Sequence, residues 1–326
     1  MNERTRKTSI ATALGAILGA AVLSAAVVAQ APAPGDGPEL CVAARGDVRV
    51  QKGTAGCTAE GTGSIAIAKG DGAEAAAIEG DHNKAKAMGD ASTAVAMYGD
   101  DNDATVRGDG SEAEAMAGDG NTATVHGNDS TAYSGAGDDN TATVDGDGNL
   151  AAAGLGDGNV ATVEGDANFA VASEGDDNVV TIEGNGNAAE SGMGDGNVAS
   201  VEGNDSSATA FDGDDNVSRV TGDQSSAFTG SGDDNQATTV GDGSIAAAGA
   251  GDDNVATTIG DGSEAIAAEG DDNTASVEGD QSSAYAGDAD DTTATVVGDG
   301  SNATAVGTDG CTVTVEGDGQ SSSTCE

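Results

Sequence analysis

Tryptophan is absent from the sequence, and aromatic residues make up only 2% of its 326 residues. A conventional globular core buries large side chains such as Leu, Ile, Val and Phe. Here the hydrophobic fraction of 37% consists mostly of alanine and valine. We therefore expect a thin core rather than ordinary globular domains.

Basic residues are also scarce: 11 Lys and Arg stand against 57 Asp and Glu, for a formal net charge of −46. Binding to a phosphate backbone depends on Lys and Arg, so this composition argues against a nucleic-acid partner. Anionic membrane surfaces are disfavoured for the same reason, and no membrane contact is expected once the targeting segment is removed.

Groups suited to catalysis are equally sparse. The two histidines, His82 and His126, have no nucleophile or ligand cluster at catalytic spacing. Aspartates are abundant, but none differs from its repeated counterparts as a general acid or base would have to. The sequence therefore predicts no enzymatic activity.

Residues 1–29 have the features of a secretory signal peptide. Arg4, Arg6 and Lys7 form a basic start, an apolar run covers residues 10–28, and small residues close it. Cleavage after Ala29 is preferred over cleavage after Ala31, because Pro32 follows the second position directly. An uncleaved membrane anchor is the alternative, since the apolar run is nearly long enough to span a bilayer. We expect a secreted or cell-surface protein.

Four cysteines lie in two pairs, Cys41 with Cys57 and Cys311 with Cys325. An even number of cysteines in an exported protein indicates disulfides. Of the three pairings, Cys41–Cys57 with Cys311–Cys325 requires no contact between the two ends of the chain. Metal binding is a poor alternative because no histidine lies nearby. We expect a linker and disulfide cap in residues 30–60 and a second disulfide cap in residues 308–326.

Residues 61–307 form an uninterrupted array of repeats. Each repeat is 19 residues long and consists of two half-repeats, of 9 and 10 residues. Each half-repeat has an Asn or Ser slot, usually with glycine three residues before it and alanine two residues after it. Asn-x-Ala-x-Val alternates with the period of a strand, and Gly-Asp-x is typical of a turn. The sequence predicts an all-β solenoid of about 14 coils, with two short strands per coil and disulfide-capped ends. Disorder is the alternative, given the charge and the few aromatics, although it would not require an uninterrupted register.

The repeat also predicts which side chains point inward. If alanine faces the interior, the Asn or Ser slot two residues earlier does so too, and stacked asparagines can form side-chain amide ladders. The expected inward ladder consists of Asn121, Asn140, Asn159, Asn178, Asn197, Asn216, Asn235, Asn254 and Asn273.

Aspartate recurs at the turns and predicts two columns of side chains along the solenoid. The first column consists of Asp81, Asp100, Asp119, Asp138, Asp157, Asp176, Asp195, Asp214, Asp233, Asp252, Asp271 and Asp290. The second consists of Asp71, Asp90, Asp109, Asn128, Asp147, Asp166, Asn185, Asn204, Asp223, Asp242, Asp261, Asp280 and Asp299.

Oxygen-rich sites suit Ca²⁺, so the first column is a candidate calcium site, although no cofactor is required. The alternative is that aspartate only satisfies turn geometry and its charge is solvated. The calcium-binding Gly-Gly-x-Gly-x-Asp nonapeptide is not present in the sequence.

The half-repeat Gly-x-x-Asn-x-Ala, as in residues 118–123 and 156–161, resembles the bacterial curlin repeat. Ser-x-Ala half-repeats, as in residues 64–68 and 111–115, resemble the head repeats of trimeric autotransporter adhesins. The resemblance covers residues 61 to about 307 and implies an extracellular β-solenoid.

These features predict an exported acidic β-solenoid with a structural or adhesive role and contacts at the cell surface or matrix. A Ca²⁺-binding repeat module is the alternative. Ice binding and curlin-like amyloid formation are further alternatives; the first rests on outward threonine pairs such as Thr122/Thr124 and Thr141/Thr143. Threonine is also simply a favourable strand residue.

Overall fold

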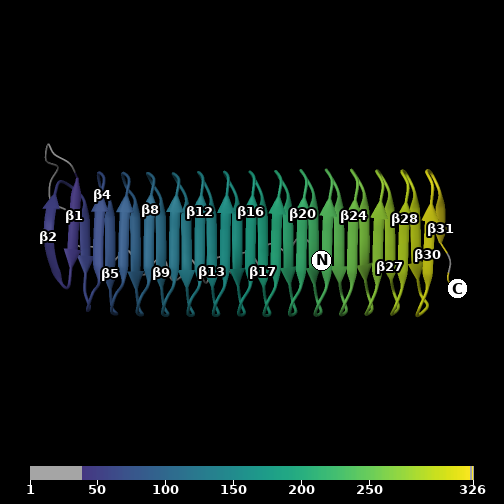
Figure 1. Ribbon diagram of the computed structural model, residues 1–326, viewed down its shortest axis with the longest axis horizontal. Coiled ribbons are helices and arrows are strands. Elements are labelled where there is room, and N and C mark those ends of the chain that lie inside the picture. The colour runs from purple at the N-terminus through teal and green to yellow at the C-terminus, as the bar shows by residue number, and fades with distance from the viewer. Residues whose placement is uncertain (1–38, 324, 326) are drawn as a thin grey trace. The chain divides into compact units, whose positions relative to one another are not determined.

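The computed structural model describes residues 39–323 and residue 325 (Figure 1). The chain is an all-β solenoid of about 14 turns with a period of about 19 residues, which confirms the predicted fold class. The predicted signal peptide and both cleavage positions lie outside the described residues. No helix of the described part of the chain is long and apolar enough to cross a membrane.

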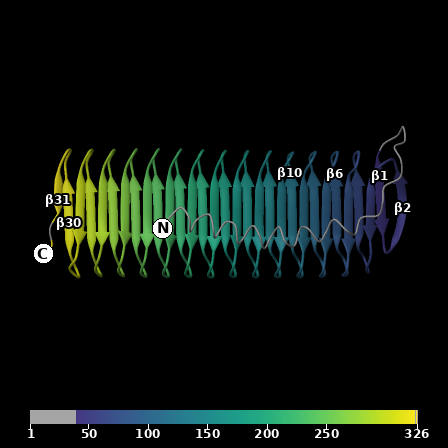
Figure 2. The ribbon, with the colours of Figure 1, turned by 180° about the vertical axis from the view of Figure 1, so that it is seen from behind.

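The chain divides into two units, residues 1–163 and residues 164–326. From β3 onward, the even-numbered strands of each unit pair side by side in one sheet, called sheet A, and the odd-numbered strands pair in a second, called sheet B, whereas β1 and β2 both belong to sheet A (Figures 1 and 2). Each coil therefore contributes one strand to each sheet, as the two half-repeats predict.

The described strands of unit 1 that belong to sheet A are β1 (Leu40–Ala44), β2 (Asp47–Lys52), β4 (Ile65–Lys69), β6 (Lys84–Met88), β8 (Asp103–Arg107), β10 (Thr122–His126) and β12 (Thr141–Asp145). Those of sheet B are β3 (Gly56–Ala59), β5 (Glu74–Ile78), β7 (Thr93–Met97), β9 (Glu112–Met116), β11 (Thr131–Gly135) and β13 (Leu150–Gly154). Strand β14 (Val160–Glu164) spans the boundary between the units.

In unit 2 the strands of sheet A are β16 (Val179–Glu183), β18 (Val198–Glu202), β20 (Val217–Thr221), β22 (Gln236–Val240), β24 (Val255–Ile259), β26 (Thr274–Glu278), β28 (Thr293–Val297) and β30 (Thr312–Glu316). The strands of sheet B are β15 (Phe169–Ser173), β17 (Ala188–Gly192), β19 (Ser207–Phe211), β21 (Ser226–Gly230), β23 (Ile245–Gly249), β25 (Glu264–Ala268), β27 (Ser283–Gly287), β29 (Asn302–Val306) and β31 (Ser321–Ser323).

The core is formed by small side chains in register from coil to coil. Ala123 pairs with Ala142 and Val125 with Val144 on neighbouring strands, and all four residues are fully buried. Because side chains alternate along a strand, the residues between them face outward on sheet A. Buried alanine and valine side chains on both inner faces therefore form the core, which agrees with the thin core expected from composition.

At the N-terminal end the repeat gives way to an antiparallel hairpin. β1 pairs antiparallel with both β2 and β4, with a register shift between Val42 and Ala43. All residues of β2 are exposed. Such a hairpin, with a bulge and charged residues on its outer strand, is a common way to protect a sheet edge from pairing with other chains. The sequence predicted a cap here, but not the reversal of β1.

Both predicted disulfides are present. Cys41 is linked to Cys57 with a Cα–Cα distance of 5.6 Å, and Cys311 to Cys325 with a Cα–Cα distance of 5.8 Å. The first joins β1 of sheet A to β3 of sheet B. The second ties residue 325 to the start of the last sheet-A strand. Each disulfide therefore closes the coil nearest one end of the repeat.

Candidate functional site: hydrogen-bonded aspartate ladders

The two aspartate columns lie at opposite turns of each coil. Members of the first column, such as Asp119 between β9 and β10, occupy turns that lead from sheet B to sheet A. Members of the second, such as Asp90 between β6 and β7, occupy turns that lead back from sheet A to sheet B.

Glycine precedes these aspartates because successive turns stack closely. Gly118 has φ +154°, and a Cβ atom built there would lie 1.9 Å from the carbonyl oxygen of Gly137 in the next coil. The residue after the aspartate takes the left-handed conformation, as Asp139 does with φ +58°. Glycine, asparagine and aspartate adopt this conformation more readily than other residues, which explains the Gly-Asp-Gly and Gly-Asp-Asp turns.

In the first column, each aspartate side chain bonds to the backbone of the preceding coil. The N–H of Asp81 donates to Oδ1 of Asp100 at 2.7 Å, and the N–H of Asp100 donates to Oδ1 of Asp119 at the same distance. The pattern runs from Thr62 to Asp157 Oδ1 in unit 1 and from Asp176 to Asp309 Oδ1 in unit 2, and the last bond lengthens to 3.4 Å. We call this chain of bonds the first ladder.

The second column forms an equivalent second ladder. The N–H of Asp71 donates to Oδ1 of Asp90 at 2.8 Å. Asparagine takes the place of aspartate at some positions: the backbone N–H of Asp109 donates to Oδ1 of Asn128 at 2.9 Å. The amide of Asn128 in turn donates to Oδ1 of Asp147 at 3.2 Å. Asparagine therefore keeps the acceptor of the ladder, adds a donor and lowers the charge.

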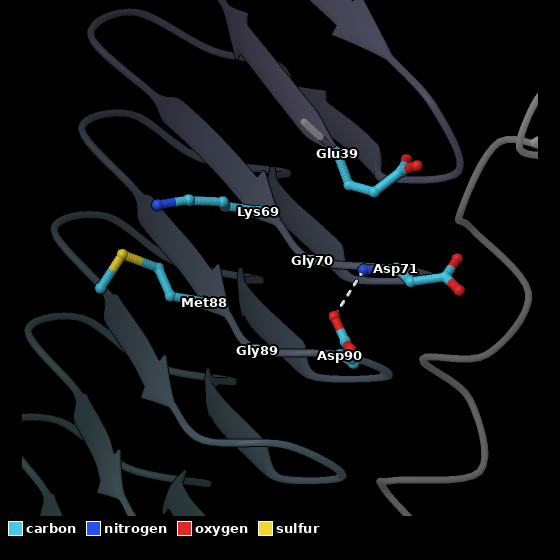
Figure 3. A pocket seen from close by; sticks show the side chains of 7 residues that line it. All are labelled: Glu39, Lys69, Gly70, Asp71, Met88, Gly89 and Asp90. Carbon is cyan, nitrogen blue, oxygen red and sulfur yellow. Dashed lines mark hydrogen bonds between the residues drawn. The ribbon is translucent and has the colours of Figure 1, made fainter. Parts of the chain in front are cut away.

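The N-terminal start of the second ladder is completed by residues outside the repeat (Figure 3). Oε2 of Glu39 accepts a hydrogen bond from the backbone N–H of Thr54, and the Thr54 hydroxyl lies 2.5 Å from Oδ1 of Asp71. The N–H of Gly72 donates to the same hydroxyl at 2.8 Å. Glu39, Asp71 and Asp90, together with Lys69, line a shallow pocket beside the cap. Nothing in the repeat pattern identified Glu39 or Thr54, because both precede its first turn.

A third run of acids comes from the left-handed turn position. In unit 2 this position is aspartate in five successive coils, Asp215, Asp234, Asp253, Asp272 and Asp291. Desolvation raises the pKa of Asp253, and the charges of Asp234, Asp272, Asp252 and Asp271 raise it further. In unit 1 glycine interrupts this position, for example at Gly120 between Asp101 and Asp139. Unit 2 therefore holds the densest stack of like charges.

A smaller cluster in unit 2 combines two carboxyl groups with a phenol. A hydrogen bond between the side chains of Glu269 and Asp288 raises the pKa of Glu269, and the charge of Asp288 adds to the shift. The hydroxyl of Tyr285 donates to Oδ1 of Asp288 at 3.3 Å. The pKa of Tyr285 is raised by desolvation and by the same two carboxylates.

All nine asparagines of the predicted inward ladder are fully buried. Their hydrogen bonds go mainly to backbone rather than to one another: Oδ1 of Asn121 accepts the N–H of Asn140 at 3.0 Å, and Nδ2 of Asn121 donates to the carbonyl of Gly137 at 2.9 Å. The Nδ2 atoms of Asn235 and Asn273 are the exceptions, since neither has a hydrogen-bond partner within the described part of the chain. Serine does the same in sheet B, where the Ser130 hydroxyl donates to Gly146 and accepts from the N–H of Asn149. The expected amide-to-amide stacking is thus replaced by side-chain-to-backbone bonds, which satisfy the turn carbonyls.

The chemistry of the ladders is that of structural acceptors. Each ladder carboxylate of the kind shown by Asp100 accepts a backbone N–H, and such a charge-assisted hydrogen bond is stronger than one between neutral groups. Among residues 39–323 and 325, no three Asp, Glu, His or Cys side chains gather where they could hold a metal ion. Calcium binding along the first column therefore stays a prediction. The alternative, that aspartate satisfies turn geometry, is supported by the ladder bonds.

Comparison with known proteins adds no functional assignment: no family model, no curated protein and no solved structure matches the chain.

Proposed function

We propose that the protein is an exported, non-catalytic, acidic β-solenoid with a structural or adhesive role at the cell surface. The observation that carries the proposal is the uniform use of the repeated polar side chains as hydrogen-bond partners between coils. Asp100 and Asn121 each bind backbone of a neighbouring coil, and their counterparts 19 residues away do the same. Because the same hydrogen bonds recur in successive coils, the polar side chains form a regular surface rather than one distinguished site.

The two disulfides support the location. Disulfides persist outside the reducing cytoplasm, and both described pairs are oxidised, with no free cysteine among the described residues. A closed coil at each end also suits a protein that must withstand an extracellular environment without a large core.

The test is to produce the full-length chain in bacterial cells and follow its location. We expect a processed form that begins at Gln30, lies outside the cytoplasm, is reached by added protease and carries no free thiol. A chain that lacks residues 1–29 is the matched control and should stay inside the cells with reduced cysteines. Retention of the unprocessed full-length chain in the cytoplasm would reject the export proposal.

The role itself is tested on the producing cells. Deletion of the gene should weaken attachment of cells to surfaces or matrix, and the purified mature protein should restore it or compete with it. Unchanged attachment together with unchanged envelope integrity would reject a structural or adhesive role.

A further inference from the structure

The basic residues of the chain are confined to a small part of it. Three of the 11 lie in residues 1–38, outside the described part, and seven of the remaining eight lie between residues 45 and 107. These seven are Arg45, Arg49, Lys52, Lys69, Lys84, Lys86 and Arg107. The same segment holds ten acids against these seven bases, so it is close to balanced while the rest of the described chain is strongly acidic.

Register brings several of these bases onto one surface, the outer face of sheet A in unit 1. Lys69 of β4 pairs with Met88 of β6, which pairs with Arg107 of β8. Lys69 and Arg107 are exposed and Met88 is half-buried. Figure 3 shows the side chains of Lys69 and Met88 on the same side of the sheet, away from the Asp71 carboxylate. We call Lys69, Met88 and Arg107 the basic triplet.

On the strands of this face few acids oppose the triplet, although Asp71 and Asp90 at the adjoining turns line the same pocket as Lys69 and Met88. Asp103 of β8 lies there, and its carboxylate is 3.8 Å from Nζ of Lys84 on the neighbouring strand. Beyond Arg107 the same column continues through His126 to Asp145, where its sign reverses. The basic triplet is therefore limited to three successive strands.

Unit 2 presents the complementary pattern at the same strand position of sheet A. Glu278 of β26 pairs with Val297 of β28, which pairs with Glu316 of β30. All three residues are exposed, Val297 to 44%. We call Glu278, Val297 and Glu316 the acidic triplet. The order is acidic, apolar, acidic, where the basic triplet is basic, apolar, basic.

The two triplets also share one spacing. Neighbouring strands lie about 4.8 Å apart, so the two charges of each triplet are separated by roughly 10 Å, with an apolar side chain between them. Both triplets lie on parallel strands with the same spacing. The charges of one triplet can therefore lie opposite those of the other without a change in the strand spacing of either sheet. Two sheets that pack face to face are themselves about 10 Å apart, a distance that these side chains can fill.

We propose that the basic triplet of one copy docks on the acidic triplet of a second copy, so that the protein self-associates through the outer faces of sheet A. Lys69 and Arg107 pair with the two glutamates, and Met88 packs against Val297. An anionic bilayer fits less well, because the acidic ladders beside the basic triplet would be drawn towards a surface of their own sign. This inference does not depend on the proposed function.

The salt dependence follows from two opposed electrostatic effects. At about 0.01 M salt the screening length is about 30 Å, and the net charges of the two copies repel. At about 0.15 M it falls to about 8 Å, which screens distant charges but spares opposed charges in contact. Association should therefore be stronger at the intermediate salt concentration than at the low one.

The experiment measures the oligomeric state of the mature protein by sedimentation over a range of concentrations at these two salt levels. We expect concentration-dependent association at the intermediate level. Lys69→Glu with Arg107→Glu, and separately Glu278→Lys with Glu316→Lys, should each weaken association about tenfold or more. The two charge-reversed variants mixed together should associate with each other, because each then supplies the face that the other lacks.

Matched controls change net charge by the same amount away from the triplets. Arg45→Glu with Arg219→Glu matches the first variant, and Glu112→Lys with Glu264→Lys matches the second; both controls should associate like the wild type. A wild type that is monomeric at every concentration would overturn the proposal, as would charge-reversed variants that associate unchanged or fail to associate on mixing. Binding of a monomeric wild type to anionic phosphatidylglycerol vesicles through Lys69 and Arg107 would also overturn it and assign the basic triplet to a membrane.

Discussion

The backbone N–H of Asn140 donates a hydrogen bond of 3.0 Å to the side-chain oxygen of Asn121, the residue at the same position of the preceding coil. Both residues are fully buried. The Asn121 side chain therefore connects two consecutive coils at a position outside the strands, where no strand pairing joins them.

Asn140→Ala should destabilise the protein by a few kcal/mol. The Asn140 side chain accepts the N–H of Asn159 at 2.9 Å and donates to the carbonyl of Gly156 at 2.8 Å. A buried group that loses its partner costs about 1–3 kcal/mol. Asn140→Ser is the control, since serine makes both kinds of bond at equivalent positions such as Ser130. Chemical denaturation should show a smaller loss for serine; equal losses would mean that volume, rather than hydrogen bonding, governs this position.

Substitution of glycine by alanine should have very different effects at two turns. At Gly118 a Cβ atom would lie 1.9 Å from the carbonyl oxygen of Gly137, whereas at Gly72, with φ +67°, it would meet nothing within 4 Å. Gly72→Ala should cost only the left-handed backbone penalty of about 1–2 kcal/mol. Gly118→Ala must also separate two coils and should cost more than about 4 kcal/mol. Comparable denaturation midpoints for the two variants would contradict the close stacking of turns.

Replacement of Cys41 and Cys57 by alanine should lower stability by about 2–4 kcal/mol, the usual contribution of a disulfide that closes a loop of this size. The bond spans 16 residues and joins the N-terminal hairpin to sheet B. Hydrogen exchange should accelerate first in β1 to β4. Cys311→Ala with Cys325→Ala should instead loosen β30 and β31. Identical exchange patterns in the two variants would show that the disulfides do not act locally.

Acidification from neutral pH should at first stabilise unit 2. The pKa of Asp253 and that of Glu269 are raised above their ordinary values, chiefly by desolvation for Asp253 and by the side-chain hydrogen bond with Asp288 for Glu269. When the folded pKa exceeds the unfolded one, the stabilising contribution is fully present below the unfolded pKa. It is lost as the pH rises through the folded pKa.

The measurement is the melting temperature between neutral pH and the upper end of the carboxyl range, about pH 5. It should rise as the pH falls across this window, and Asp253→Asn should raise the neutral value while flattening the curve. Asp119→Asn is a suitable control, because asparagine keeps the Oδ1 acceptor of the ladder, as Asn128 does in the second ladder. A melting temperature that falls throughout the window would contradict the sign of the effect.

Calcium should act on the protein mainly through charge screening. The ladder carboxylates each accept a backbone N–H through Oδ1, and the described residues hold no three-ligand group for a metal. Calcium and magnesium at equal ionic strength should therefore raise the melting temperature alike. A rise at micromolar calcium that magnesium fails to reproduce would indicate bound ions, since a ligand that binds only the folded state stabilises it once its concentration exceeds its dissociation constant. It would restore the calcium-binding alternative.

The sequence was sufficient to place most strands, because the slot periodicity and the Gly-Asp turns both repeat without interruption. The inward positions of Asn121 and Ala123 followed from the same pattern and agree with their burial. The antiparallel direction of β1 could not be predicted from the sequence. Strand direction depends on where the chain turns in space, and the residues around Cys41 do not indicate it. The bonding of Asn121 to backbone was also missed, since side-chain spacing alone does not reveal which carbonyl lies nearby.

Two surface features escaped prediction for a different reason. Composition averages over the chain, so a net charge of −46 gave no indication that Lys69 and Arg107 share one face. The residues with positive φ before the turn glycines, such as Ala117 and Ala136, carry no sequence preference for that conformation. Their backbone conformation is imposed by the stacked neighbours. The sequence shows that the 10-residue half-repeat has one residue more than the 9-residue half-repeat, but not which conformation that residue adopts.

The ladders join each residue to the one 19 positions along the chain. Removal or duplication of one whole interior coil would therefore leave every remaining donor opposite an acceptor of the same kind, as long as the two ends are kept. A gene of this design can change length through recombination between its own repeats without losing the fold. Variants from related strains should then differ by complete coils, with the hairpin at the start and the cystine at the finish held constant.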